Sequence, residues 1–137
     1  MRYHELFEKG PSTKTAATAW VILTTANKVI LGKRSPDVNN PNQWNFFGGH
    51  IDAGETAIAA AVRELFEETG YTINPGALKE ISTIGNCTYF SATVADAGVL
   101  GTTSEISKVR GFRVTDLPDN LHSKTENFFD HLVSLLK

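Results

Sequence analysis

Three glutamates on one predicted helix have the types and spacing to do chemistry. Glu64 lies three positions before Glu67 and four before Glu68, and residues at these spacings are neighbours on a helix surface. Their mutual repulsion destabilises the helix unless a positive charge lies between them. Because Mg²⁺ and Mn²⁺ prefer hard oxygen ligands, a divalent cation that also binds substrate phosphate fits this group. A solvated acidic helix face is the alternative interpretation.

The residues before the helix favour the metal interpretation. Gly48 and Gly49 have no side chains, so their backbone can approach a ligand closely. The amide groups at a helix N-terminus also attract anions. Arg63 can reach Glu67 one turn along the helix and Glu55 near its start, but one arginine cannot neutralise the whole group. We therefore expect a phosphate-bearing ligand beside a bound cation.

The helix that carries these glutamates is predicted over residues 56–69. This stretch contains no Gly or Pro and is rich in alanine, and Gly70 stands where a C-terminal cap belongs. The apolar residues at helical spacing predict one buried stripe. That stripe consists of Ile58, Ala61, Val62, Leu65 and Thr69.

Strands surround this helix in the sequence. Short β-prone runs predict a hairpin at 15–23 and 29–33, a short strand at 44–47 that ends at the glycine pair, and strands at 78–84, 88–94 and 106–114. The turn-forming residues of 35–43 predict a loop. A final helix is predicted to begin at Ser123, with a capping box, and to run to Leu136. This order predicts an α/β sandwich, a mixed sheet with helices on both faces.

Composition limits the classes of protein that need considering. The 137 residues, 41% of them hydrophobic, predict a single domain over 1–137. A net charge of −2 argues against a nucleic-acid-binding surface. Cys87 is the only cysteine, which excludes an intrachain disulfide. No signal peptide or membrane span is visible, so we expect a cytoplasmic protein without a membrane partner.

One segment resembles a known family. Gly49, five residues, Glu55, seven residues and then RELFEETGY over 63–71 match the catalytic box of the Nudix hydrolases without departure. The resemblance implies an α/β/α sandwich with a mixed sheet. It also implies hydrolysis of a nucleoside diphosphate linked to another group X, with Mg²⁺ or Mn²⁺ as cofactor. Small members of the family often dimerise, which makes a homodimer an expectation.

The resemblance also implies roles for individual residues of the box. Glu64, Glu67 and Glu68 would bind the metal, and the Gly48 carbonyl would be a further ligand. Glu55 and Arg63 would form an ion pair that braces the loop against the helix.

The general base has two candidates among the acidic residues. A carboxylate correctly placed to accept the proton of the attacking water accelerates hydrolysis by roughly 10²–10⁴-fold. Glu64 is the first choice. Glu105 is the second, because relatives often place a carboxylate from that region over the metals; an ordinary exposed loop glutamate is the alternative.

Substrate recognition depends on weaker signals. The planar guanidinium of Arg34 suits phosphate, and a solvated charge at a strand end is the alternative. Trp44, Phe46 and Tyr89 are aromatic candidates for stacking on a base, although most such rings will be core. His122 resembles the histidine base of GDP-mannose mannosyl hydrolases, which attack carbon, although those enzymes carry a degenerate box. The alternatives are thus a nucleotide-sugar hydrolase that uses His122 and a nucleotide-binding sensor without turnover. Nucleoside triphosphates are the first substrates to test.

Overall fold

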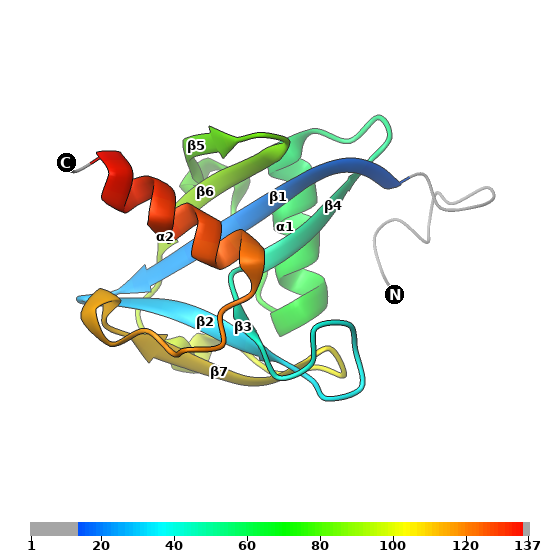
Figure 1. The fold of residues 1–137 in the computed structure, drawn as a ribbon. Coiled ribbons are helices and arrows are strands. Elements are labelled where there is room, and N and C mark those ends of the chain that lie inside the picture. Colours follow the sequence, from blue (N-terminus) through cyan, green and yellow to red (C-terminus); the bar gives the residue numbers. More distant parts are fainter. Residues whose placement is uncertain (1–13, 136–137) are drawn as a thin grey trace.

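The sheet is built around one long strand, β1 (Lys14–Thr25), in a computed structural model that describes residues 14–135 (Figure 1). Along one edge β1 pairs in parallel with β6 (Cys87–Thr93). Its other edge is shared by two antiparallel partners, β4 (Phe47–Asp52) toward its start and β2 (Lys28–Arg34) at its end. The β1–β2 hairpin expected from the sequence is therefore confirmed.

Three shorter strands complete the mixed sheet. β5 (Lys79–Ile84) is antiparallel to β6, while β3 (Trp44–Asn45) and β7 (Ile106–Phe112) are both antiparallel to β2. The main path runs β3-β2-β1-β6-β5, with β4 and β7 off that path. β4 and β2 therefore pair with successive parts of the same edge of β1.

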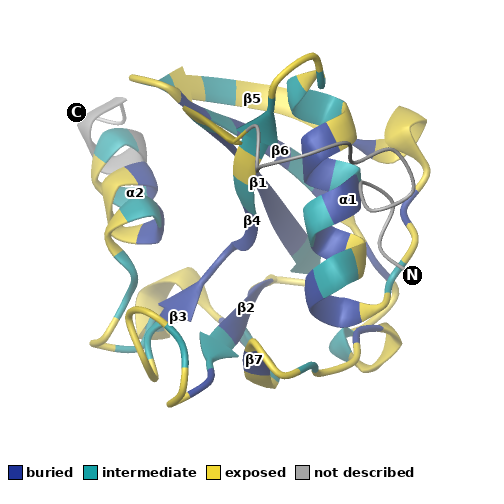
Figure 2. Ribbon diagram, turned by 90° about the vertical axis from the view of Figure 1, so that its right-hand side faces the viewer, coloured by how far each residue is buried: buried dark blue, intermediate teal, exposed yellow. Residues whose placement is uncertain are grey.

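Two helices cover opposite faces of this sheet: α1 (Ala57–Thr69) and α2 (Ser123–Leu135) (Figure 2). Side chains alternate along a strand. In β1, Ala19 and Val21 belong to the core beneath α1, whereas Trp20 belongs to a second core that includes Phe128 of α2. The α/β/α sandwich expected from the sequence is confirmed.

The boundaries of α1 follow its capping residues. The Thr56 hydroxyl accepts from the Ala59 amide at 3.1 Å, and Gly70 adopts the left-handed conformation that ends the helix. The expected buried stripe is rotated, however, since Arg63 and Glu68 are buried while Ile58 is half-buried. The small residues Ala60 and Ala61 are fully buried against the sheet, and the two charged side chains share this buried side of the helix.

The glycine pair does not end a strand, as the sequence suggested, but lies within β4. Gly48 is paired with Trp20 and Gly49 with Ala19. A Cβ on Gly48 would lie 2.1 Å from the Ala19 carbonyl oxygen, so no other residue fits without backbone movement. The requirement for glycine comes from the tight pairing of β4 against β1.

The start of α2 also differs from the expectation. His122 stands at the N-cap position, where its Nδ1 accepts from the Lys124 amide at 3.2 Å, and Ser123 is the first helical residue. The expected capping box is therefore wrong, because the imidazole ring supplies the cap. Leu136, the expected end of this helix, lies outside the described residues. So does the N-terminal region in which the sequence shows no signal peptide.

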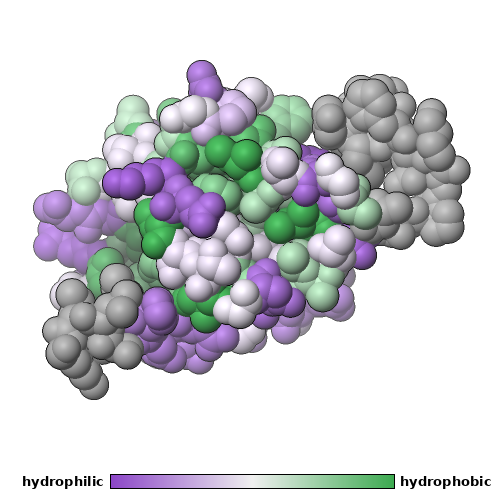
Figure 3. Space-filling model, turned by 90° about the horizontal axis from the view of Figure 1, so that it is seen from above, coloured by the Kyte–Doolittle hydropathy of each residue, from purple (hydrophilic) through white to green (hydrophobic). Residues whose placement is uncertain are grey.

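The surface seen from above mixes apolar and hydrophilic side chains in several separate patches (Figure 3). Within residues 14–135, no helix is long and apolar enough to cross a membrane.

Candidate active site

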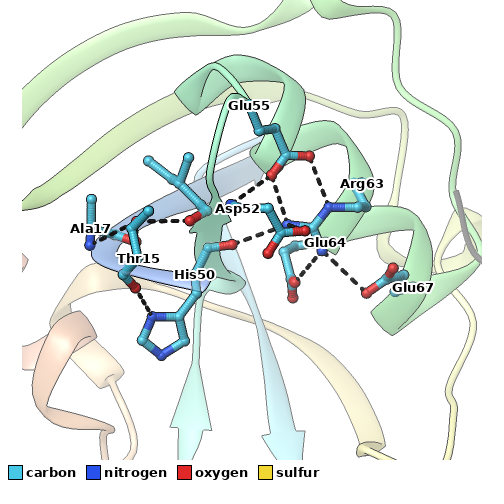
Figure 4. Close-up of polar contacts among 9 residues, drawn as sticks. Thr15, Ala17, His50, Asp52, Glu55, Arg63, Glu64 and Glu67 are labelled. Atoms are coloured by element: carbon cyan, nitrogen blue, oxygen red, sulfur yellow. Dashed lines mark hydrogen bonds and ion pairs between the residues drawn. The ribbon is translucent and has the colours of Figure 1, made fainter. Parts of the chain in front are cut away.

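Arg63 is the centre of the polar group on α1 (Figure 4). Its side chain is only 5% exposed, and it binds Glu55 through two hydrogen bonds, from Nε and Nη2, of 2.9 Å each. Nη2 also donates to the His50 carbonyl at 3.0 Å. Glu55 in turn accepts from the Asp52 amide at 3.0 Å. The Glu55–Arg63 ion pair thus ties the turn after β4 to the middle of α1.

The other side of the same guanidinium faces the glutamates of α1. Arg63 Nη1 donates to Glu64 Oε1 at 2.7 Å and lies 3.5 Å from Glu67 Oε1. The hydrogen bonds that Arg63 donates to Glu55, followed by the charge of Glu64, raise the pKa of Arg63 above its ordinary value, although burial opposes this. Arg63 is therefore a permanent cation that holds two of the three glutamates.

Glu64 lies directly over the backbone of Gly49. A Cβ on Gly49 would be 2.7 Å from Glu64 Oε2 and 2.8 Å from Glu64 Cδ. Burial raises the pKa of Glu64 to about 7, with Arg63 opposing this shift and the charges of Glu67 and Glu105 adding to it. A carboxylate with this pKa can take up or release a proton near neutral pH.

Glu68 is the most deeply buried of the three glutamates, with 4% of its surface exposed. Its Oε1 accepts from the Gly48 amide at 2.9 Å. Burial raises the pKa of Glu68 well above its ordinary value, and the nearby charge of Glu64 adds to this effect. The Gly48 hydrogen bond and the charge of Arg34 act in the opposite direction. Glu68 therefore connects α1 to the glycine pair of β4.

The donor chemistry of this group fits a divalent cation. Four carboxylates contact the single Arg63 guanidinium, those of Asp52, Glu55, Glu64 and Glu67, and Glu68 adds a fifth acid near Glu64. This excess of buried oxygen donors suits Mg²⁺ or Mn²⁺. Across residues 14–135, no three acidic, His or Cys side chains converge as a preformed metal site. Metal binding would require Glu64 and Glu67 to turn from Arg63.

Glu105 and Arg34 border the carboxylates from another direction. Glu105 is exposed and precedes β7, and its charge raises the pKa of both Glu64 and Glu68. Its backbone carbonyl accepts from the Ser35 amide at 2.9 Å, which places it next to Arg34. The structure thus brings both sequence candidates to the same side of the group.

The aromatic candidates lie in the core between the sheet and α2. Phe46 and Tyr89 are each 1% exposed, and their rings pack edge to face with centroids 6.1 Å apart. The Tyr89 hydroxyl donates to the Lys124 carbonyl at 2.7 Å. Trp44 is also buried, and it packs against Phe112. In this arrangement none of the three offers a ring face for stacking.

Two contacts were not anticipated from the sequence. The His50 carbonyl accepts from Arg63, and the Asn40 side chain lies 3.3 Å from His122 Nε2. The position of His50 within the box spacing could have suggested the first contact. No local sequence signal indicates the second, because 82 positions separate the two residues.

Comparison with known proteins agrees with the fold and the box. The family model described as "NUDIX domain" matches residues 13–132 of the chain. The chain belongs to the Nudix family. Its sheet and helices superpose on a MutT protein from Methanosarcina mazei with a TM-score of 0.65 and 19% identity, over 88% of this chain and 94% of the other.

Curated relatives share shorter segments with this Nudix chain. A protein named Nudix hydrolase 3 from Arabidopsis thaliana is 37% identical over 68 residues, which is 48% of this chain and 9% of the relative. The 8-oxo-dGTP diphosphatase of Escherichia coli is 40% identical over 52 residues, or 38% of this chain and 40% of the relative. The matched regions thus span less than half of each relative's length.

Proposed function

We propose that this Nudix protein hydrolyses the pyrophosphate linkage of a nucleoside diphosphate joined to another group, with Mg²⁺ or Mn²⁺ as cofactor. The observation that carries the proposal is the group of three glutamates on α1: Glu64 and Glu68 lie against the Gly48–Gly49 backbone, and Glu67 lies beside Arg63. One of the relatives supports the substrate class, since its name describes an 8-oxo-dGTP diphosphatase. We propose a small-molecule substrate in a cytoplasmic setting.

Different residues of the chain would have different roles in this reaction. Glu64, Glu67 and Glu68, with the Gly48 carbonyl, would hold the cation. When bound, the cation supplies charge neutralisation of the phosphate oxygens and acidification of water. Arg34 would bind a phosphate through its guanidinium. The Glu55–Arg63 pair keeps the turn after β4 in place.

Glu64 is our choice for the group that accepts the proton of the attacking water. Arg63 binds its Oε1, while its Oε2 lies over the Gly49 backbone, and burial raises its pKa to about 7. Glu105 is the second candidate, because its charge acts on both Glu64 and Glu68. In this step water adds to phosphorus, the bridging oxygen leaves with its electron pair, and the carboxylate takes the proton.

The contacts of His122 favour attack at phosphorus over attack at a sugar carbon. Its Nδ1 already accepts from the Lys124 amide, so the ring proton of the neutral form lies on Nε2. Neither nitrogen then has a lone pair available to act as a base.

A substrate panel with Mg²⁺ in ¹⁸O-labelled water tests the proposal. The panel contains nucleoside triphosphates, dinucleoside polyphosphates and nucleotide sugars, and the products are identified by mass. We expect turnover with the label in a phosphate product, retained by the exposed-surface control Glu80→Gln. Label in a released sugar would support the carbon-attacking alternative. Binding of nucleotides without turnover would overturn the proposal and identify a sensor.

A further inference from the structure

His122 joins two segments that are far apart in the sequence. Its amide donates to the Trp44 carbonyl at 2.8 Å, and its own carbonyl accepts from the Thr125 and Glu126 amides at 3.0 and 2.9 Å. With Nδ1 accepting from Lys124, the residue satisfies several amides at the start of α2. Its backbone and ring together fix the start of α2 to the first residue of β3, next to the loop over residues 35–43 that precedes this strand.

The second ring nitrogen of His122 faces that same loop. Nε2 lies 3.3 Å from the side-chain amide nitrogen of Asn40. A backbone amide can only donate, so Nδ1 is the unprotonated nitrogen and Nε2 carries the proton. The contact becomes a hydrogen bond when the Asn40 amide presents its oxygen, which a half-turn of the amide achieves.

The loop in turn determines where the Arg34 side chain lies. The Asn39 carbonyl, adjacent to Asn40, accepts from Arg34 Nε at 2.6 Å. The backbone closes the loop, since the Arg34 amide donates to the Gln43 carbonyl at 2.8 Å and the Asn42 amide donates to the Arg34 carbonyl at 2.9 Å. A displacement of residues 39–40 would therefore move the guanidinium.

The charge of Arg34 acts on both Glu68 and His122. Its charge lowers the pKa of Glu68 on α1 and also that of His122 before α2. The Arg34 charge is therefore near enough to the glutamates to interact with the anionic part of a substrate held there.

We propose that His122 is a positioning residue which, through Asn40 and the loop over residues 35–43, orients Arg34 toward the substrate phosphate. The inference rests on the proposed function for the role of Arg34. It assigns His122 an effect on substrate affinity, which a helix cap alone would not have. It also differs from a base role, which would affect the chemical step.

Two loop variants separate this role from general damage to the loop. Asn40 and Asn42 both adopt the left-handed conformation, with φ of 54° and 61°. Glycine tolerates that conformation, so Asn40→Gly removes the side chain that faces His122 without straining the backbone. Asn42→Gly is the matched control in the same loop, since only its backbone takes part in the contacts described above.

A variant of His122 separates the ring from the helix cap. Asparagine is among the best N-cap residues, so His122→Asn keeps the cap of α2 while its shorter side chain loses Asn40. We expect His122→Asn and Asn40→Gly to raise KM about 2- to 12-fold, the equivalent of one lost hydrogen bond, with kcat and the melting temperature little changed. Asn42→Gly should keep the wild-type KM. In an Arg34→Ala background, Asn40→Gly should add little to KM.

An NMR measurement tests the inference without turnover. The Arg34 Nε–H resonance should move toward the position of a solvent-exposed arginine in Asn40→Gly and His122→Asn, and should stay in place in Asn42→Gly. An unchanged resonance in the first two variants overturns the inference. A lower kcat with unchanged KM in His122→Asn would overturn it in favour of a base. A third outcome is that Arg34→Ala keeps the wild-type KM, while the Arg34 Nε–H signal shifts in Asn40→Gly and His122→Asn. That outcome would refute the proposed role of Arg34 and support the positioning itself.

Discussion

Glu68 combines a buried acidic side chain with a hydrogen bond to the strand below it. Its Oε1 accepts from the Gly48 amide, and burial raises its pKa well above the ordinary value. A buried charge costs free energy unless it is compensated. The protein therefore maintains at Glu68 a group that is unfavourable for folding alone, which is typical of functional sites.

Replacing Glu68 should separate this function from stability. In Glu68→Gln the amide oxygen can still accept from Gly48, while the charge is lost. We expect Mg²⁺-dependent turnover to fall by at least about 100-fold, since loss of groups that merely support metal ligands already costs about 10–100-fold. The melting temperature should not fall. Retained turnover would remove Glu68 from the metal site, and Glu80→Gln is the exposed control.

Gly49 is the second residue whose role follows from one contact. A methyl group on Gly49 would collide with the Glu64 carboxylate at 2.7 Å and would push it away from the strand. We expect Gly49→Ala to lower kcat by about 10-fold or more, since small displacements of reacting groups can cost about 100-fold. Gly111→Ala in β7 is the matched strand control, because the nearest atoms to its new Cβ belong to the Lys28 side chain, at 3.2 Å or more. Equal activity of the two variants would contradict the placement of Glu64.

At the scale of elements, α1 is joined to the end of β4 by the two-pronged Glu55–Arg63 contact. Arg63 reaches Glu55 and the His50 carbonyl at the same time, because a guanidinium donates in several directions. Lysine has the charge but not this planar arrangement of donors. The joint therefore depends on arginine specifically.

Arg63→Lys should weaken this joint measurably. We expect the free energy of unfolding to fall by about 1.5–3 kcal/mol, the net value of hydrogen bonds that involve charged groups. Urea unfolding followed by circular dichroism measures the change. The control is Arg113→Lys at an exposed position after β7, where the loss should be near zero. Similar losses for the two variants would show that Arg63 is not the joint.

The start of α2 should make stability depend on pH. Burial, followed by the charges of Arg34 and Lys124, lowers the pKa of His122 below the 6.5 of an unperturbed histidine. The unfolded chain therefore binds the proton first, and stability contributed by neutral His122 is complete above about pH 6.5. It is lost as pH falls from there through the lower folded pKa. Thermal unfolding between pH 5 and 8 should show this decline, and His122→Asn should reduce it; an identical decline in both proteins would contradict the assignment.

For the whole molecule, the sequence predicted the layers and the glutamate helix because these depend on local periodicity and caps. It did not predict that Gly48 and Gly49 lie within β4, since that depends on their pairing with β1, nearly 30 residues away in the chain. The inward turn of Glu68 and the contact of His122 with Asn40 likewise depend on packing between distant segments. Local patterns therefore located the chemistry, and the tertiary contacts determined its geometry.

The concentration of acids at one place should also make the stability of the whole fold depend on metal. Five carboxylates lie around Arg63 and Gly48, and a bound cation would relieve their repulsion. Mg²⁺ that binds only the folded chain should stabilise it by about 2.7 kcal/mol when its free concentration is about 100 times Kd. Thermal unfolding across a MgCl₂ titration, at ionic strength held constant with NaCl, measures this shift.

Glu68→Gln is the control for that titration, because it removes one proposed ligand and leaves the Gly48 hydrogen bond in place. We expect its melting temperature to respond to MgCl₂ much less than that of the wild-type protein. An equal response in both proteins would place the cation elsewhere on the surface. In the expected result, the response to Mg²⁺ disappears in Glu68→Gln, while Glu80→Gln behaves as wild type. The stability of the sandwich would then depend on the same oxygen atoms that are proposed to hold the metal for hydrolysis.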